Sequence, residues 1–235
     1  MLRYISALPV LLSAAFAQPS GVTPSVCPAG IASIADCPVG GCGGVSDSLL
    51  DVAKNRTDAP SGALAPLTVA QMTNLTQPAS WLTGKDRSSL QGSGQEGTPV
   101  QLMAFLIKVK PEGKESCNCG LGKRADTDIH LVMVTNKNGQ EAQSISGEIT
   151  PRVRLAGHPD WNLKNVKTLQ KKFVRLTGWL MLDTAHIPHP VLLPGERPRT
   201  GLNRASNWEV HPITRIEVCT STVTKCRAGE GWQDF

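Results

Sequence analysis

The sequence predicts a mainly β protein built around a small five-stranded barrel, with one helix and an irregular N-terminal extension. Two observations carry this prediction. Several segments after residue 95 alternate apolar and polar residues, and the clearest, Phe173–His186, has apolar side chains at even positions from Val174 to Leu182. Alternation of this length is typical of a strand with one face in a core. Gly178 lies in its middle, and a mid-strand glycine favours the sharp coiling of a small barrel.

Three earlier segments are also predicted to be strands. Pro99–Lys110 is a long apolar run, Thr127–Thr135 alternates around Leu131, and Ser144–Arg154 alternates around Gly147. An Asn-Gly pair between the second and third segments favours a turn. Because proline cannot donate to a ladder, Pro151 should end the third strand or lie at a sheet edge.

The period then changes to that of a helix. Asp160–Lys172 has apolar residues at helical spacing and two lysines in its last turn, which favours a helix. A loop rich in proline, glycine and arginine leads to the fifth strand, Trp208–Cys219, where Ile216 is expected on the face opposite Ile213. The order is therefore three strands, a helix and two strands.

This order resembles the OB-fold, a five-stranded barrel with a helix between the third and fourth strands. The resemblance covers roughly residues 96–220. The motifs GWLMLDTAH and WEVHPIT are also similar to motifs of uncharacterised exported bacterial proteins. Thermonuclease-type proteins share the barrel, but their acidic residues and paired arginines find no matching positions here, so none of their site residues is carried over.

The first residues have the pattern of a secretory signal peptide. Arg3 precedes an apolar run from Ile5 to Phe16, which closes on a small-residue boundary at Ala17. The run is too short for an ordinary membrane span. We expect cleavage before Gln18 and a secreted or periplasmic chain without a membrane span.

The region between the signal peptide and the barrel is predicted to be irregular. Residues 18–95 are rich in Gly, Pro, Ser, Thr and Ala, and only short helical patterns begin near Asp47 and Thr68. A Gly- and Ser-rich joint at residues 92–97 separates them from the strands. We predict that residues 96–220 form a barrel domain and residues 221–235 a tail, and that residues 96–235 fold without this extension.

Seven cysteines are present, and an oxidising compartment favours disulfides. Cys219 and Cys226 are separated by a short segment that can close a hairpin-like loop, so they are predicted to pair. Cys117 or Cys119 is expected to pair with an N-terminal cysteine. An odd count leaves at least one cysteine free, intermolecular or bound. Metal-thiolate binding is the alternative, although Cys-x-Cys is a poor zinc half-site.

Polar residues near the strand ends are the candidate functional groups. Candidate catalytic residues are Asp128, His130 and Glu148, and candidate metal ligands are Asp183, His186, Glu209 and His211. If strands four and five are antiparallel neighbours, the last four residues should meet at one rim. Histidine with carboxylates suits zinc or another divalent ion, or general acid–base chemistry. The alternative is a structural role, in which these side chains pair with arginines or backbone groups.

Composition and net charge narrow the range of possible functions only coarsely. The net charge is +5, and the second part of the chain contains Arg152, Arg154, Arg175, Arg197, Arg199 and Arg204. These arginines suit a nucleic-acid face, but only Trp179 offers an aromatic platform beside one of them. The sequence predicts an exported, non-enzymatic binding or interaction module of unknown ligand. The alternatives are a metal-assisted hydrolase, acting for example on phosphodiesters, and an oligonucleotide-binding protein.

Overall fold

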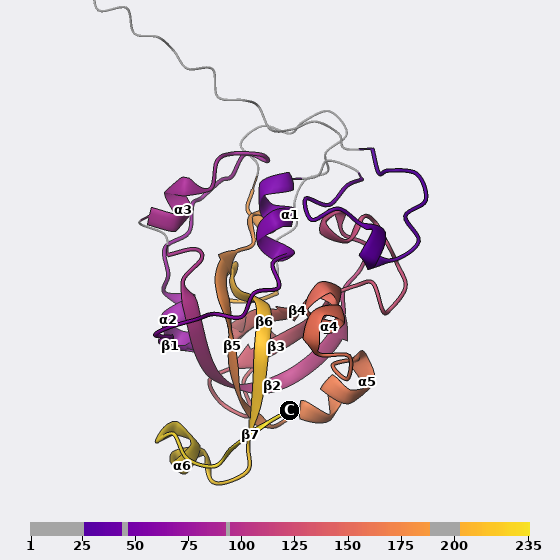
Figure 1. Cartoon of the computed structure of the whole chain (residues 1–235). Coiled ribbons are helices and arrows are strands. Elements are labelled where there is room, and N and C mark those ends of the chain that lie inside the picture. The colour runs from indigo at the N-terminus through magenta and orange to yellow at the C-terminus, as the bar shows by residue number, and fades with distance from the viewer. Residues whose placement is uncertain (1–25, 44–46, 93–94, 189–202) are drawn as a thin grey trace, which may run out of the picture.

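The computed structural model describes residues 26–43, 47–92, 95–188 and 203–235 (Figure 1). The strands are β1 (Ala65–Thr68), β2 (Pro99–Pro111), β3 (Ile129–Val134), β4 (Ile145–Ile149), β5 (Phe173–Leu182), β6 (Trp208–Cys219) and β7 (Trp232–Asp234). The α-helices are α1 (Ser48–Lys54), α2 (Val69–Thr73), α3 (Ser88–Gly92), α4 (Pro151–Gly157), α5 (Leu163–Val166) and α6 (Val223–Arg227). Short 3₁₀ turns are η1 (Ile34–Asp36), η2 (Ser116–Asn118), η3 (Glu141–Gln143), η4 (Lys167–Leu169) and η5 (Thr184–His186). The predicted signal peptide at 1–17 lies outside the described residues.

Five strands close into the predicted OB-like barrel. β2 pairs antiparallel with β3, and β3 with β4. β4 then pairs parallel with β6, and β6 antiparallel with β5. The barrel closes where β5 pairs antiparallel with β2. Two strands that the sequence did not predict extend the sheet, because β1 pairs with β2 and β7 with β6.

The two faces of β5 are those predicted from its alternation. Val174, Leu176, Leu180 and Leu182 all belong to the buried hydrophobic cluster. Gly178 lies between them and faces a shift in the register of β6. A Cβ atom on Gly178 would lie 2.3 Å from the carbonyl oxygen of Pro212. The glycine is therefore required by the close approach of the neighbouring strand.

The predicted faces of β6 are wrong in one respect. Ile213 and Ile216 were expected on opposite faces, but both belong to the buried cluster. The register of the β5–β6 pair shifts on both sides of Gly178, which pairs with Ile213. Each shift adds an unpaired residue to β6, so the alternation of its side chains restarts.

The chain leaves the sheet earlier than the predicted third strand, Ser144–Arg154. β4 ends at Ile149, and Pro151 begins α4. Thr150 caps this helix, since its Oγ1 accepts a hydrogen bond from the backbone N of Val153 at 3.2 Å. Proline suits the first helical position because its missing N–H would have no partner there. The helical connection between the third and fourth barrel strands thus comprises α4 and α5.

Residues before the barrel contribute to its core. Val69, Met72, Trp81 and Leu90 belong to the same buried cluster as the barrel strands. The predicted division of the chain at residue 95 stays a prediction. Of the helices in the described ranges, none has the length and apolar character to cross a membrane.

Three disulfides constrain the described chain. Cys219 pairs with Cys226, as the sequence predicts. Cys27 pairs with Cys42, and Cys37 pairs with Cys119 across 82 positions of sequence. Cys117 is the one cysteine without a disulfide, and it is buried. Disulfides are typical of proteins that reside outside the reducing cytosol.

Candidate metal centre

A polar cluster covers the outer face of the barrel at β3, β4 and β6. His130 on β3, Glu148 on β4, and Glu209 and His211 on β6 alternate with core residues and therefore point away from the core. These side chains are nevertheless buried, with Glu209 0% and His211 1% exposed. Burying ionisable groups is costly unless they are paired or bind a cation. The segments that cover this face therefore determine which partners these groups have.

The cover consists of the N-terminal segment and the loop before β3. Asn55 Nδ2 donates to the carbonyl oxygens of Val39 and Cys117, each at 2.8 Å. Lys54 Nζ lies 2.7 Å from Glu115 Oε1. Figure 1 shows α1 beside the barrel where β5 ends and β6 begins. The polar face is thus closed by a segment that the Cys37–Cys119 disulfide ties down.

His211 lies at the centre of the cluster. Its Nδ1 is 3.0 Å from Glu209 Oε1 and 3.5 Å from Glu148 Oε2, and its Nε2 is 3.6 Å from Asp128 Oδ2. Among the described residues, His211 Nε2, Asp128 Oδ2 and Glu148 Oε2 are buried without a hydrogen-bond partner. One ligand atom from each of Asp128, Glu148 and His211 lies within 4.8 Å of the other two. This group has the spacing and chemistry of a metal site.

Glu209 holds the ring of His211 in place. Arg204 in turn binds Glu209 Oε2 through Nη1 at 3.0 Å and Asp183 Oδ2 through Nη2 at 2.7 Å. Asp183 Oδ2 also lies 2.6 Å from His186 Nδ1. A carboxylate on Nδ1 leaves Nε2 as the ligand atom, which is the usual second-shell arrangement around a metal-binding histidine.

Metal binding by the four predicted ligands stays a prediction, and the structure places these residues in two different arrangements. Asp183 and Glu209 are engaged by Arg204, and His186 belongs to none of the groups with metal-ligand spacing in the described chain. Of the four, His211 joins Asp128 and Glu148, which the sequence singled out as catalytic candidates. The rim predicted between β5 and β6 is a chain of ion pairs.

His130 supports Glu148. Its Nδ1 lies 2.7 Å from Glu112 Oε1 and 3.1 Å from Glu148 Oε1, and its Nε2 lies 2.9 Å from Ser146 Oγ. Burial opposes the charged imidazole, but the bonds to Glu112 and Glu148 raise the pKa of His130 to about 9. Both ring nitrogens have hydrogen-bond partners, so His130 orients Glu148. Glu112, His130 and Glu148 also place one ligand atom each within 4.8 Å of the other two.

Burial and neighbouring charges shift the pKa values of Asp128, Glu148 and His211 in different directions. Burial, together with the charges of Glu115 and Glu148, raises the pKa of Asp128 well above its usual value. For Glu148, burial is outweighed by the hydrogen bond with His130 and the charge of His211, so the pKa is well below the usual value. For His211, burial is outweighed by Glu209 and Glu148, and the pKa is about 9. A bound cation would take the place of the protons on Asp128 and His211.

A cavity connects His211 with the surface. It has a volume of about 490 Å³ and lies between α1 and the β5–β6 pair, lined among others by Arg56, Arg87, Trp179, Met181 and His211. Arg87 is bound by Glu96. The guanidinium carbon of Arg56 lies 3.4 Å from the ring centre of Trp179. The cavity borders the cluster at His211, whose side chain is itself fully buried.

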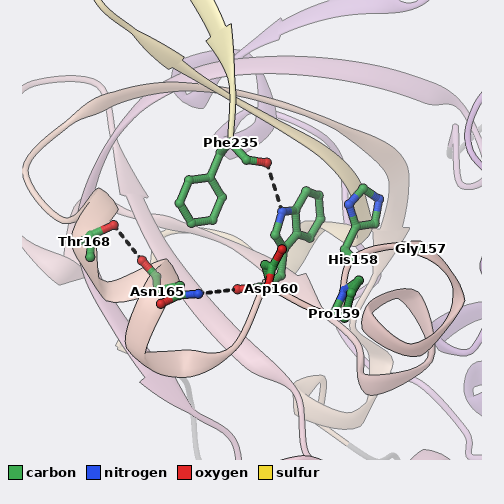
Figure 2. Close-up of a pocket in the computed structure, with 8 residues that line it drawn as sticks. Gly157, His158, Pro159, Asp160, Asn165, Thr168 and Phe235 are labelled. Carbon is green, nitrogen blue, oxygen red and sulfur yellow. Dashed lines mark hydrogen bonds between the residues drawn. The ribbon is translucent and has the colours of Figure 1, made fainter.

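A second cavity, of about 310 Å³, is lined by none of the groups with metal-ligand spacing found in the described residues (Figure 2). His158 stacks on Trp161 with ring centres 3.7 Å apart, and Trp161 Nε1 donates to the carbonyl oxygen of Phe235 at 3.1 Å. Asn165 Nδ2 donates to the carbonyl oxygen of Asp160 at 2.9 Å. Trp161, Asn165 and Thr168 donate to backbone carbonyl oxygens of neighbouring drawn residues, and we do not assign this cavity a ligand.

The arginines of the proposed nucleic-acid face that lie in the described ranges have protein partners. Arg175 pairs with Glu217, and Arg154 donates to backbone carbonyls, among them those of Ala125 and Thr127. Arg204 is held by the ion pairs described above. Arg197 and Arg199 lie outside the described residues. Oligonucleotide binding stays a prediction.

The loop before β3 supplies residues that the sequence reasoning did not single out. Glu112, Glu115 and Asn118 surround the cluster, and Lys54 reaches it from α1. These residues are far apart in sequence and have no shared periodicity. The one signal was the Cys117-Asn118-Cys119 motif, which marks a loop fixed by a disulfide to the N-terminal segment.

The fold and the cluster define the class of molecule, an OB-like barrel with a covered polar site. Comparison of the chain with family models, curated proteins and solved structures gives no match.

Asp51 gives this cover a measurable pH dependence. It is 2% exposed, and burial, only partly offset by Ser116, raises its pKa from 3.8 to about 7. Between these two values the folded chain keeps a proton that the unfolded chain has lost, so this group lowers the free energy of unfolding as pH rises from 3.8 to about 7. Asp51→Asn removes the titration and should stabilise the protein at pH 8 by about 2–4 kcal/mol.

Urea unfolding of both proteins from pH 3.5 to 8 tests this prediction. The difference between wild type and Asp51→Asn should be small at the acid end and grow toward neutral pH. A difference that is constant over the whole range would contradict the burial argument.

Proposed function

We propose that the chain is an exported binding protein whose ligand is a divalent metal ion held by Asp128, Glu148 and His211. One observation carries the proposal: three residues with metal-ligand spacing each have a buried polar atom without a hydrogen-bond partner in the described chain. Each such buried atom costs about 1–3 kcal/mol. A cation would satisfy all three at once.

The surrounding residues support this assignment. Glu209 fixes the His211 ring so that Nε2 faces Asp128, and His130 fixes Glu148 through its other oxygen. Outer-shell partners of this kind orient ligands and are themselves important for metal affinity. One imidazole with two carboxylates suits zinc or manganese better than calcium, which prefers oxygen ligands.

Metal-assisted hydrolysis is the second candidate function. The observation that favours it is the cavity of about 490 Å³ that reaches His211. Three protein ligands leave a coordination position for water, and a bound cation lowers the pKa of that water and makes it a nucleophile. A chromogenic phosphodiester assayed with added zinc or manganese tests this candidate. Turnover that a chelator abolishes and His211→Ala lacks would support it.

Metal titration tests the main proposal directly. Full-length protein is stripped with a chelator and titrated with Zn²⁺ or Mn²⁺ by calorimetry. His211→Ala and the isosteric Asp128→Asn should each weaken binding at this centre by more than about 100-fold, since even an outer-shell partner is worth 10–100-fold. Circular dichroism verifies that both variants fold.

His158→Ala is the matched control. His158 stacks on Trp161 and belongs to none of the metal-spaced groups, so this variant should bind the ion as the wild type does. Absence of binding in the wild type, or unchanged binding in His211→Ala, would overturn the proposed centre.

A further inference from the structure

A second group of potential ligands lies beside the proposed centre and shares Asp128 with it. Glu115, Cys117 and Asp128 each place one ligand atom within 4.8 Å of the other two. We propose that these three residues bind a second divalent cation, so that Asp128 bridges two metal ions. The inference rests on the proposed function, because Asp128 belongs to both positions.

Unpartnered polar atoms surround this position as well. In the described structure, Glu115 Oε2, Asn118 Oδ1 and Asp128 Oδ2 are buried and have no hydrogen-bond partner. Asn118 is 0% exposed, and its Nδ2 donates to Asp128 Oδ1 at 2.8 Å. The amide therefore lies against the shared carboxylate, with its own oxygen unsatisfied. Acceptors without donors beside the shared carboxylate point to a cation.

Glu115 keeps one oxygen open toward this position. Lys54 neutralises Glu115 through Oε1 only, at 2.7 Å, and leaves Oε2 available. A ligand atom of Glu115 lies within 4.8 Å of those of Cys117 and Asp128.

Cys117 determines which metals the second position takes. Its thiol is the one that forms no disulfide, and it is 1% exposed. Coordination replaces the S–H bond by a sulfur–metal bond and releases one proton to solvent, with no change of oxidation state. Thiolate ligands favour zinc and related metals over magnesium and calcium. Two cations bridged by a carboxylate form the arrangement with which many hydrolytic sites hold an attacking and a leaving oxygen.

Cobalt titration distinguishes the two positions, because thiolate-bound Co²⁺ absorbs strongly in the near ultraviolet. Chelator-stripped full-length protein should bind two equivalents of Co²⁺ and develop this absorption. Cys117→Ser should bind one equivalent without the absorption. His211→Ala should lose one equivalent and keep the absorption. Glu115→Gln, which leaves the thiol in place, should lose the second equivalent.

Each other result overturns a defined part of the assignment. One equivalent without thiolate absorption removes the second position and leaves the first. One equivalent with thiolate absorption makes Cys117 a ligand of a single centre and also removes the second position. No binding of Co²⁺ overturns both proposals. Because the wild-type stoichiometry and spectrum decide among these results, the test does not depend on the folding of any variant.

Discussion

Replacing Gly178 by Ala is expected to lower the free energy of unfolding by about 3 kcal/mol or more. The new Cβ would lie 2.3 Å from the Pro212 carbonyl oxygen and 2.8 Å from Val210 Cγ1. The nearest atom belongs to the backbone of β6, so no side-chain rotation relieves the contact. The β5–β6 pair would have to separate at the point where the barrel register shifts.

Gly157→Ala is the control for this substitution. Gly157 lies at the end of α4, and an added Cβ would meet no atom within 4 Å. The same methyl group should therefore be neutral or stabilise the protein by up to about 1 kcal/mol, because alanine has less freedom in the unfolded chain. Urea unfolding followed by tryptophan fluorescence compares the two. Equal stability of both variants would show that the barrel accommodates a side chain at residue 178.

Arg204→Met should destabilise the protein by about 3–5 kcal/mol, the usual cost of breaking a buried ion pair by removing one partner. The Arg204 side chain is 5% exposed and binds Asp183 and Glu209, whose side chains are 5% and 1% exposed. Without the guanidinium group, the buried carboxylates of Asp183 and Glu209 each lose one cation and keep only the imidazoles of His186 and His211. Burial of Asp183 is outweighed by the hydrogen bond with His186 and by the charges of Lys54 and Arg204, which lower its pKa, so the loss of stability should be smaller in acid than at neutral pH.

Arg215→Met is the matched control. Arg215 lies on β6, the strand that follows Arg204. The Arg215 side chain is 53% exposed, and its partner Asp234 is 68% exposed. The second partner of Arg215, the buried Glu217, keeps Arg175 when Arg215 is removed. Exposed ion pairs contribute about 0–1 kcal/mol, so this variant should remain close to the wild type in stability. If Arg204→Met were equally mild, the chain of ion pairs at the rim would not stabilise the fold.

The barrel was predictable because its signal is local. The alternation within β5 and the bounds of β6 follow from consecutive residues, and the order of elements then selects the topology. The end of the third strand was predicted wrongly because the rule for proline has two outcomes. Pro151 can end a strand or begin a helix, and Thr150 decides for the helix by capping it.

The candidate site was predictable only in part. His130 and Glu148 lie opposite each other in the β3–β4 ladder, and strand periodicity places both on the outer face. No period relates Lys54 or Glu115 to those strands. Their positions depend on a disulfide that joins Cys37 to Cys119 and on how a loop folds over the sheet. Such contacts arise only from the complete three-dimensional structure.

The position of β6 between β4 and β5 has a consequence for biosynthesis. A nascent chain that ends before residue 208 contains β4 and β5 but lacks the strand that pairs with both. Each strand would then present an unpaired edge, which is a template for pairing with other chains. Interrupted synthesis should therefore yield aggregation-prone fragments, and the cell that makes this protein benefits from holding it unfolded until β6 is complete.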